Sequence, residues 1–203
     1  MAISSDGYPM KPSFAHCRRP WRTRIPLQIG KSALLTIGVL LLGPAHAEKA
    51  DREKPLQIEA DRLDYDEANR VNVFNGRVTM TKGTLLIRAD RVVLKEEADG
   101  SQNAVATGKP ASLRQRRDGA PDSWVEGQGE RIEWDGRAEI ARFIQKAQLR
   151  KLEAGRVIDD VQGGRIRYDS RAETYDVEGG AAAATPDNPG GRVRVIIAPR
   201  TPK

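Results

Sequence analysis

The residues best suited to chemistry are four acidic side chains that lie within seven positions. They are Asp61, Asp64, Asp66 and Glu67. Paired carboxylates can act as the acid and base of a glycoside hydrolase or provide the oxygen ligands that Ca²⁺ prefers. Leu63 and Tyr65 alternate with these acids, however, which is typical of the solvated face of a β-strand. We therefore predict no catalytic residue, metal or cofactor, and keep a carbohydrate-active β-solenoid enzyme as an alternative.

Histidine and cysteine are confined to the beginning of the chain. The two histidines are His16 and His46, and the single cysteine is Cys17, so residues 48–203 contain neither type. This distribution excludes from that region a disulfide framework, a cysteine nucleophile, a Ser-His-Asp triad and any metal site with histidine or cysteine ligands.

The basic excess has the same uneven distribution. The 203-residue chain has 34 basic and 28 acidic residues, of which six basic and one acidic lie in residues 1–47. The remaining 28 basic and 27 acidic residues nearly balance, so the charge gives no support for nucleic-acid binding. Residues 1–47 combine basic residues, an apolar run at 33–43 and the cleavage-like triplet Ala45-His46-Ala47, which predicts a cleaved secretory signal. The apolar run is shorter than the roughly 20 residues that a membrane-spanning helix needs.

Apolar and polar residues alternate through most of residues 48–203. Examples are Leu85-x-Ile87-x-Ala89 and Val193-x-Val195-x-Ile197. Period-two alternation predicts strands with one apolar and one wet face. Turn signals such as Asn75-Gly76 and Gly163-Gly164 occur between them, so the pattern indicates an all-β sandwich, barrel or roll of many short strands.

The secondary structure of residues 137–154 is ambiguous. Taken alone, this segment is slightly more typical of a helix than of strands, because it is rich in helix-forming residues. A degenerate repeat favours strands instead, with an arginine at the same place in each unit: Arg62, Arg91, Arg131 and Arg165. Repetition of this kind is typical of stacked β units that bury one face against their neighbours. We expect these arginines to form ion pairs with acids on neighbouring strands, with contacts to lipid phosphates as the lesser alternative.

Five short motifs in order carry a resemblance to a known family. They are Gln57-Ile58-Glu59-Ala60-Asp61, Val73 to Val78, Lys82 to Val92, Gly108-Lys109-Pro110-Ala111 and Val125-Glu126-Gly127. Over residues 55–182 the sequence resembles the OstA-like (organic solvent tolerance) family, which includes periplasmic bridge proteins of lipopolysaccharide export. The resemblance implies an all-β fold, a single slightly twisted, open β-jellyroll of antiparallel strands spanning residues 48–182.

The resemblance also implies a non-enzymatic function in the periplasm. A protein of this kind would bind lipopolysaccharide, with the acyl chains in an apolar groove and the sugars outside. It would link an inner-membrane export complex component to an outer-membrane translocon, both with similar β-rolls. A membrane-tethered relative of the same pathway, with residues 33–43 uncleaved, is an alternative.

Nine residues are expected to line the groove. The positions matched by the family resemblance imply Leu56, Ile58, Leu113, Ile132 and Trp134. The alternation of inward and outward residues along the predicted strands adds Val73, Met80, Leu85 and Ile87. Any one of them could instead be ordinary core, and Trp134 could cap the end of a strand before Asp135-Gly136.

The edges of an open roll would leave strands unpaired. We expect the first strand, in Pro55–Ala60, to pair with the last strand of a second copy, which would give a head-to-tail homo-oligomer. The alternative is a monomer whose termini cover its edges. Residues 183–203 are predicted to be a flexible tail, in which a short strand at 192–197 could cap an edge or pair elsewhere.

Overall fold

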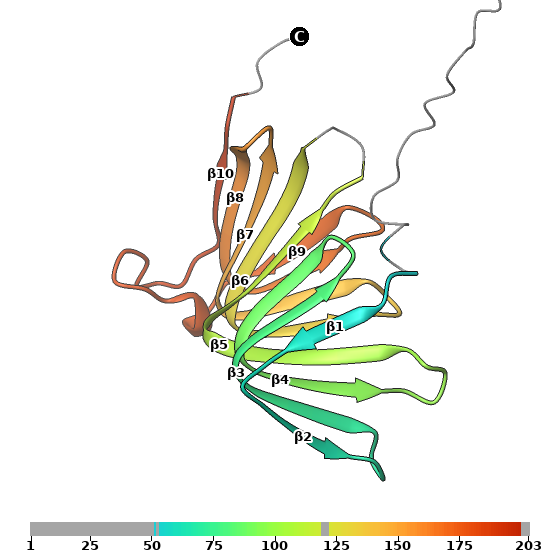
Figure 1. The fold of residues 1–203 in the computed structure, drawn as a ribbon. Helices are drawn as coiled ribbons and strands as arrows, with labels where there is room; N and C mark the ends of the chain where they lie inside the picture. The colour runs from blue at the N-terminus through green and yellow to red at the C-terminus, as the bar shows by residue number, and fades with distance from the viewer. Residues whose placement is uncertain (1–50, 52, 119–121, 200–203) are drawn as a thin grey trace, which may run out of the picture. The chain divides into compact units, whose positions relative to one another are not determined.

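The computed structural model describes residues 51, 53–118 and 122–199, so the predicted signal segment 1–47 lies outside the described residues. The described chain is almost entirely β-structure, with one short 3₁₀ helix, η1 (Ala181–Ala183). The strands, shown in Figure 1, are β1 (Leu56–Glu59), β2 (Arg62–Asp66), β3 (Val71–Lys82), β4 (Leu85–Glu96), β5 (Gln102–Arg116), β6 (Ser123–Asp135), β7 (Ile140–Glu153), β8 (Arg156–Asp169), β9 (Thr174–Glu178) and β10 (Arg194–Ile197).

All ten strands form one antiparallel sheet. Its order is β1-β3-β4-β5-β6-β7-β8-β10, while β2 pairs with β3 and β9 pairs with β8. Each of β3 to β8 pairs with the next strand along the chain, so the sheet is a meander with two free edges. One edge consists of β1 and β2, and the other consists of β9 and β10. The predicted all-β class and single open sheet are confirmed.

A single line of irregularities crosses the sheet near the middle of its long strands. Strand pairing shifts between Asn75 and Val78, between Arg88 and Arg91, and at matching places in each following strand. A bulge bends the strand that carries it and increases its twist. Because the bulges are aligned, they form a fold line along which the whole sheet bends over on itself (Figure 1).

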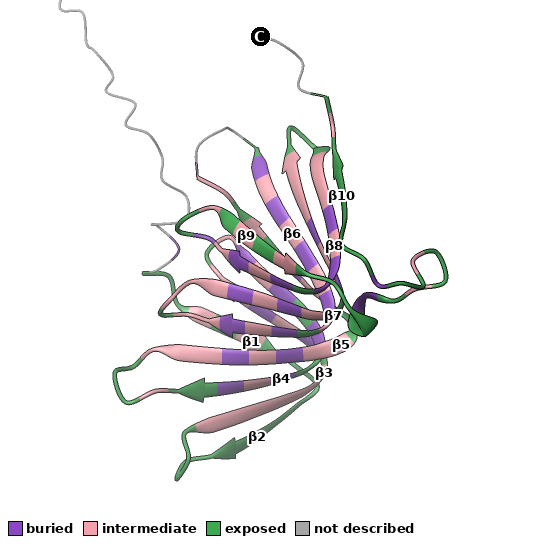
Figure 2. Ribbon diagram, turned by 180° about the vertical axis from the view of Figure 1, so that it is seen from behind, coloured by how far each residue is buried: buried purple, intermediate pink, exposed green. Residues whose placement is uncertain are grey.

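The fold line divides the sheet into two walls. The β1 wall consists of β1, residues 78–82, 85–89, 111–116, 123–129, 147–153 and 156–163, and β10. The β2 wall consists of β2, residues 71–75, 91–96, 102–107, 131–135, 140–144 and 165–169, and β9. Both walls turn their apolar faces inward, and Figure 2 shows buried residues alternating with more exposed ones along the strands.

The core lies between the walls. Met80 and Ile87 from the β1 wall and Ile132 and Phe143 from the β2 wall are each 0% exposed. A single bent sheet thus supplies both layers of the structure, and each wall covers the apolar face of the other.

Of two expectations about the strands, one is wrong and one is confirmed. The strands β3 to β8 are long rather than short, because Asn75-Gly76 and Gly163-Gly164 lie at the fold line inside β3 and β8 and do not end them. The ambiguous segment 137–154 is the strand β7, as the repeat predicted.

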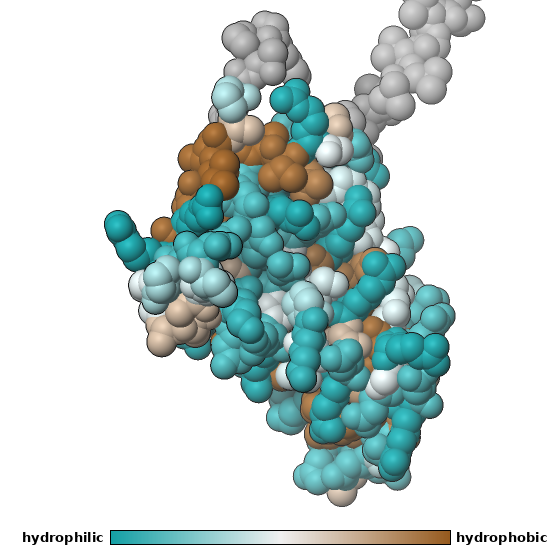
Figure 3. All heavy atoms as spheres, turned by 90° about the vertical axis from the view of Figure 1, so that its left-hand side faces the viewer, coloured by the Kyte–Doolittle hydropathy of each residue, from teal (hydrophilic) through white to brown (hydrophobic). Residues whose placement is uncertain are grey.

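The short strand predicted in the C-terminal tail is β10. It pairs with β8 in the register Val195 to Val161 and so extends the β1 wall. Val195, Ile196 and Ile197 are 46%, 52% and 67% exposed, and Figure 3 shows apolar side chains gathered on this part of the surface. Among the described residues, no helix is long and apolar enough to span a membrane.

Candidate functional site

The inner surface between the walls brings together eight of the nine predicted groove residues. Leu56 and Ile58 on β1 are half-buried and pack against the core. The other six are all at most 8% exposed: Met80, Leu85, Ile87, Leu113, Ile132 and Trp134. These eight residues come from both walls, so they form two facing apolar surfaces.

The predicted inward orientation of Val73 is wrong. Phe74 pairs with the fully buried Val92, which places Phe74 on the inner surface and its neighbour Val73 on the outer surface. Gly76 and Arg77 form a bulge opposite Asp90. Inward and outward residues still alternate along β3 through this bulge, so the face of each residue can be counted from the inward Met80. Val73 is an odd number of positions from Met80 and therefore faces outward.

Several inward aromatic residues were not predicted. Phe143 and Tyr168 are buried in the core, and Phe74 and Tyr175 pack against it. Tyr175-x-Val177 does show period-two alternation, which could have identified it as a short strand. Phe143 was missed because the segment around it has helical propensity.

The two ends of the groove are more exposed than its centre. Leu63 and Tyr65 on β2 share the inner surface with Phe74 and are 53% and 61% exposed. At the opposite end, Val195 and Ile197 share the face of the buried Val161. Each free edge of the sheet therefore carries uncovered apolar side chains that continue the inner surface.

The centre of the groove is closed in this structure, although the family resemblance implied an apolar groove that holds acyl chains. The walls are in contact, and a recess near the ends of the strands has a volume of only about 30 Å³, room for no more than a few water molecules. Its polar rim includes Lys82, Gln115 and Glu139. A long acyl chain could enter only if the walls moved apart.

Polar contacts join the walls at the mouth, the rim opposite the fold line. Arg117, which follows β5 in the β1 wall, forms a 2.7 Å ion pair with Glu173, which precedes β9 in the β2 wall. Lys82 Nζ lies 5.9 Å from the centre of the Trp134 ring. The mouth is thus held by directional contacts, whereas the interior is held by apolar packing.

Lys151 forms a further contact across the mouth. Its ammonium group donates to the backbone oxygen of Glu173 at 3.4 Å and lies 4.9 Å from the centre of the Tyr175 ring. Burial, reinforced by the nearby positive charge of Arg117, lowers the pKa of Lys151. Burial also raises the pKa of Tyr175. Both shifts reflect the partial exclusion of water from the closed mouth.

The acidic cluster has structural partners. Arg77 donates to both carboxylate oxygens of Asp61, and this hydrogen bonding lowers the pKa of Asp61. The side-chain amide of Asn69 lowers the pKa of Asp66 in the same way. A general acid needs a raised pKa, so these shifts oppose the enzyme alternative. Among the described residues, no group of three or more histidine, cysteine or acidic side chains could hold a metal ion.

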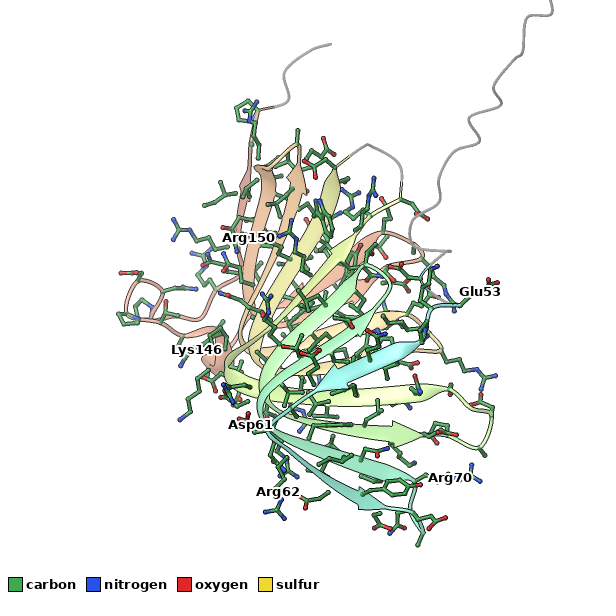
Figure 4. All side chains as sticks on the ribbon, viewed as in Figure 1. Glu53, Asp61, Arg62, Arg70, Lys146 and Arg150 are labelled. Atoms are coloured by element: carbon green, nitrogen blue, oxygen red, sulfur yellow. The ribbon has the colours of Figure 1, made fainter. Side chains whose placement is uncertain are left out.

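The repeat arginines lie on the outer surface beside the fold line, where Figure 4 labels Arg62 next to Asp61. Arg62 and Arg131 form ion pairs with acids two positions along the same strand, Asp64 at 2.6 Å and Glu133 at 2.8 Å. Only Arg165 reaches an acid on a neighbouring strand, Glu178 at 3.9 Å. Arg91 donates to the side-chain oxygen of Asn75 at 3.3 Å and not to an acid. The prediction of cross-strand ion pairs is therefore wrong for Arg62, Arg91 and Arg131. The outer position also argues against contact with phosphates at the mouth.

Comparison with known proteins identifies a family that matches most of this surface. The model of the family described as "LptA/(LptD N-terminal domain) LPS transport protein" matches residues 57–174. The match runs from β1 to the first residue of β9 and includes most of both walls.

Individual relatives agree with this match. The chain is 27% identical over 181 residues to the lipopolysaccharide export system protein LptH of Pseudomonas aeruginosa, covering 87% of this chain and 94% of LptH. It is 30% identical over 128 residues to LptA of Escherichia coli, covering 62% of this chain and 65% of LptA. The crystal structure of P. aeruginosa LptH, the LptA-homologous periplasmic component of the lipopolysaccharide transport device, superposes with a TM-score of 0.62 at 25% identity, covering 73% of this chain and 99% of LptH.

Removing the ion pair at the mouth should destabilise the closed roll. The side chain of Arg117 is 13% exposed, so Glu173→Gln should lower the free energy of unfolding by about 1.5–3 kcal/mol, the range for hydrogen bonds to charged groups. The control is Glu133→Gln, which removes the outer Arg131 pair and should cost less than about 1 kcal/mol. Urea denaturation measures both values. An equal effect of the two substitutions would show that the mouth pair contributes no more than a surface pair.

Proposed function

Because the chain belongs to the LptA/(LptD N-terminal domain) family of lipopolysaccharide transport proteins, we propose that it carries lipopolysaccharide acyl chains between its two walls. It is a periplasmic, non-enzymatic component of lipopolysaccharide transport. The observation that carries the proposal is the inner surface, on which both walls present apolar side chains to each other and polar groups are concentrated at the mouth.

The chemistry of the inner surface suits a moving acyl chain. Burial of each CH₂ group contributes roughly 0.8 kcal/mol, so a chain of many carbons gains substantially from a dry lining. Apolar contacts have no preferred direction. Residues such as Ile87, Leu113 and Ile132 therefore offer no fixed partner that would hold the lipid in one place, and the chain can slide along the groove.

Binding requires the walls to separate, and the structure suggests why the cost is acceptable. The contacts between the walls are apolar, and an inserted acyl chain replaces them with contacts of the same kind. The mouth contacts of Arg117, Lys82 and Lys151 are lost or rearranged, but these side chains lie near water and can be solvated there. The bulges of the fold line are the places where the backbone departs from regular strand geometry and are suited to act as the hinge.

The free edges suggest how copies could join. β1 and β2 leave one side unpaired, and so do β9 and β10. We propose that one edge pairs with the opposite edge of a second copy, which gives a head-to-tail oligomer because the contact does not close on itself. Similar rolls on an inner-membrane export complex component and an outer-membrane translocon would join in the same way. The exposed apolar residues Leu63, Tyr65, Val195 and Ile197 would then meet and continue the groove.

Photocrosslinking to lipopolysaccharide tests the assignment of the faces. A photoreactive residue at Ile58, Phe74 or Trp134 should label the lipid strongly, because these positions face the groove. The adjacent outward positions Glu59 and Val73 are matched controls and should label it weakly. Circular dichroism must show an intact sheet for each variant. Equal labelling at inward and outward positions would contradict the proposal.

Analytical ultracentrifugation tests the pairing of edges. The protein should show an average mass that increases with concentration. Gln57→Pro, on β1, and Val195→Pro, on β10, should each shift the protein toward the monomer, because proline removes a backbone donor and blocks an edge. Gln57→Ala keeps the donor and should assemble normally. Monomers at every concentration, or assembly of both proline variants at the normal level, would contradict edge pairing.

A further inference from the structure

Phe143 and Gly127 bring the two walls into direct contact inside the groove. Phe143 lies on β7 in the β2 wall and Gly127 on β6 in the β1 wall. A Cβ atom added to Gly127 would overlap the Phe143 ring, whose atoms are its three nearest neighbours. The ring therefore reaches across the whole space between the walls and rests on the opposite backbone.

The Phe143 ring packs into a depression on the opposite wall. Leu113 and Leu149 pair with Gly127 on either side, so the glycine forms a notch between two larger inward residues. Phe143 itself is 0% exposed. Only glycine leaves room for the ring at this depth, because the Cβ atom of any other residue at position 127 would overlap it.

The ring has small neighbours along its own strand. The inward residues on either side of Phe143 along β7 are alanines, Ala141 and Ala147. Between Phe143 and Ala147, Gln145 and Lys146 adopt positive φ angles of 63° and 51°. This is the point at which β7 crosses the fold line, so a change in the bend of the sheet would act directly on the position of the ring.

The contact divides the inner surface into two parts. One part extends toward β1 and contains Leu56, Ile58 and Met80. The other extends toward β10 and contains Val161 and Val195. An acyl chain that slides from one exposed end to the other must pass the position of the ring.

We propose that Phe143 is the gate of the groove, and that its ring must leave Gly127 before an acyl chain can pass between the walls. The proposal rests on the proposed function, because it concerns the same inner surface. It makes Phe143 a positioning residue that controls the rate of entry, while the final affinity depends on the groove as a whole.

Stopped-flow fluorescence with a dansyl-labelled undecanoic acid tests the gate. Phe143→Leu keeps an apolar side chain but shortens it, so the association rate of the probe should rise at least fivefold. Val92→Ala is the matched control, because Val92 is also 0% exposed in the same wall but lies on β4, three strands away. It should leave the rate within twofold of the unsubstituted protein. An equal acceleration by both substitutions would attribute the effect to general loosening of the core and would overturn the proposal.

A second measurement does not depend on the stability of a variant. With 2-fluorophenylalanine at position 143, whose fluorine lies away from the ring tip that touches Gly127, the fluorine resonance should shift when lipopolysaccharide is added, because the ring leaves the Gly127 backbone. An unshifted resonance in a protein that has demonstrably bound the lipid would overturn the gate and leave the proposed function intact. Failure of the unsubstituted protein to bind either the probe or lipopolysaccharide would instead contradict the proposed function.

Discussion

The structure depends on one constraint, which is that a single sheet must cover its own apolar face. No helix or second sheet covers this face in the described residues, so the sheet bends along the aligned bulges and each wall buries the other. This arrangement explains why Met80, Ile87 and Ile132 are fully buried although they belong to one continuous meander. It also explains why the sheet keeps two free edges, since bending does not pair β1 and β2 with β9 and β10. The same contacts that stabilise the fold are those that a lipid would replace.

Much of this architecture follows from the sequence, because alternation with period two is a local property. The inward faces of Met80, Leu85 and Ile132 could be read directly from it, and the repeat arginines correctly favoured strands at 137–154. The repeat has a physical meaning that the sequence did not reveal. Arg91, Arg131 and Arg165 mark the points at which alternate strands cross the fold line. Bulges look like turns in a sequence, so long bent strands were mistaken for pairs of short ones. Val73 was assigned to the wrong face because the alternation of inward and outward residues was not followed along the strand from Met80. The contact of Phe143 with Gly127 joins distant walls, and no local pattern predicts it.

Polar and apolar contacts have separate roles in this fold. Directional contacts such as Arg117 with Glu173 lie at the mouth, where water can replace them when the walls part. Apolar contacts fill the interior, where an unpaired polar group would be costly. The contacts that opening of such a groove would break are therefore mainly ones that water or apolar contacts can replace. The uncovered residues at the two edges, among them Tyr65 and Ile197, are consistent with a surface that continues into a neighbouring roll.

The central claim is that lipopolysaccharide occupies the space between the two walls, and the separation of the walls tests it most directly. Spin labels at Arg156→Cys, in the β1 wall, and Ala172→Cys, in the turn at the tip of the β2 wall, lie near opposite ends of the bent strand β8, and residues 48–203 contain no other cysteine. Pulsed electron paramagnetic resonance should show a short distance without lipid and a longer one with saturating lipopolysaccharide. An unchanged distance in protein shown to have bound the lipid would contradict the account.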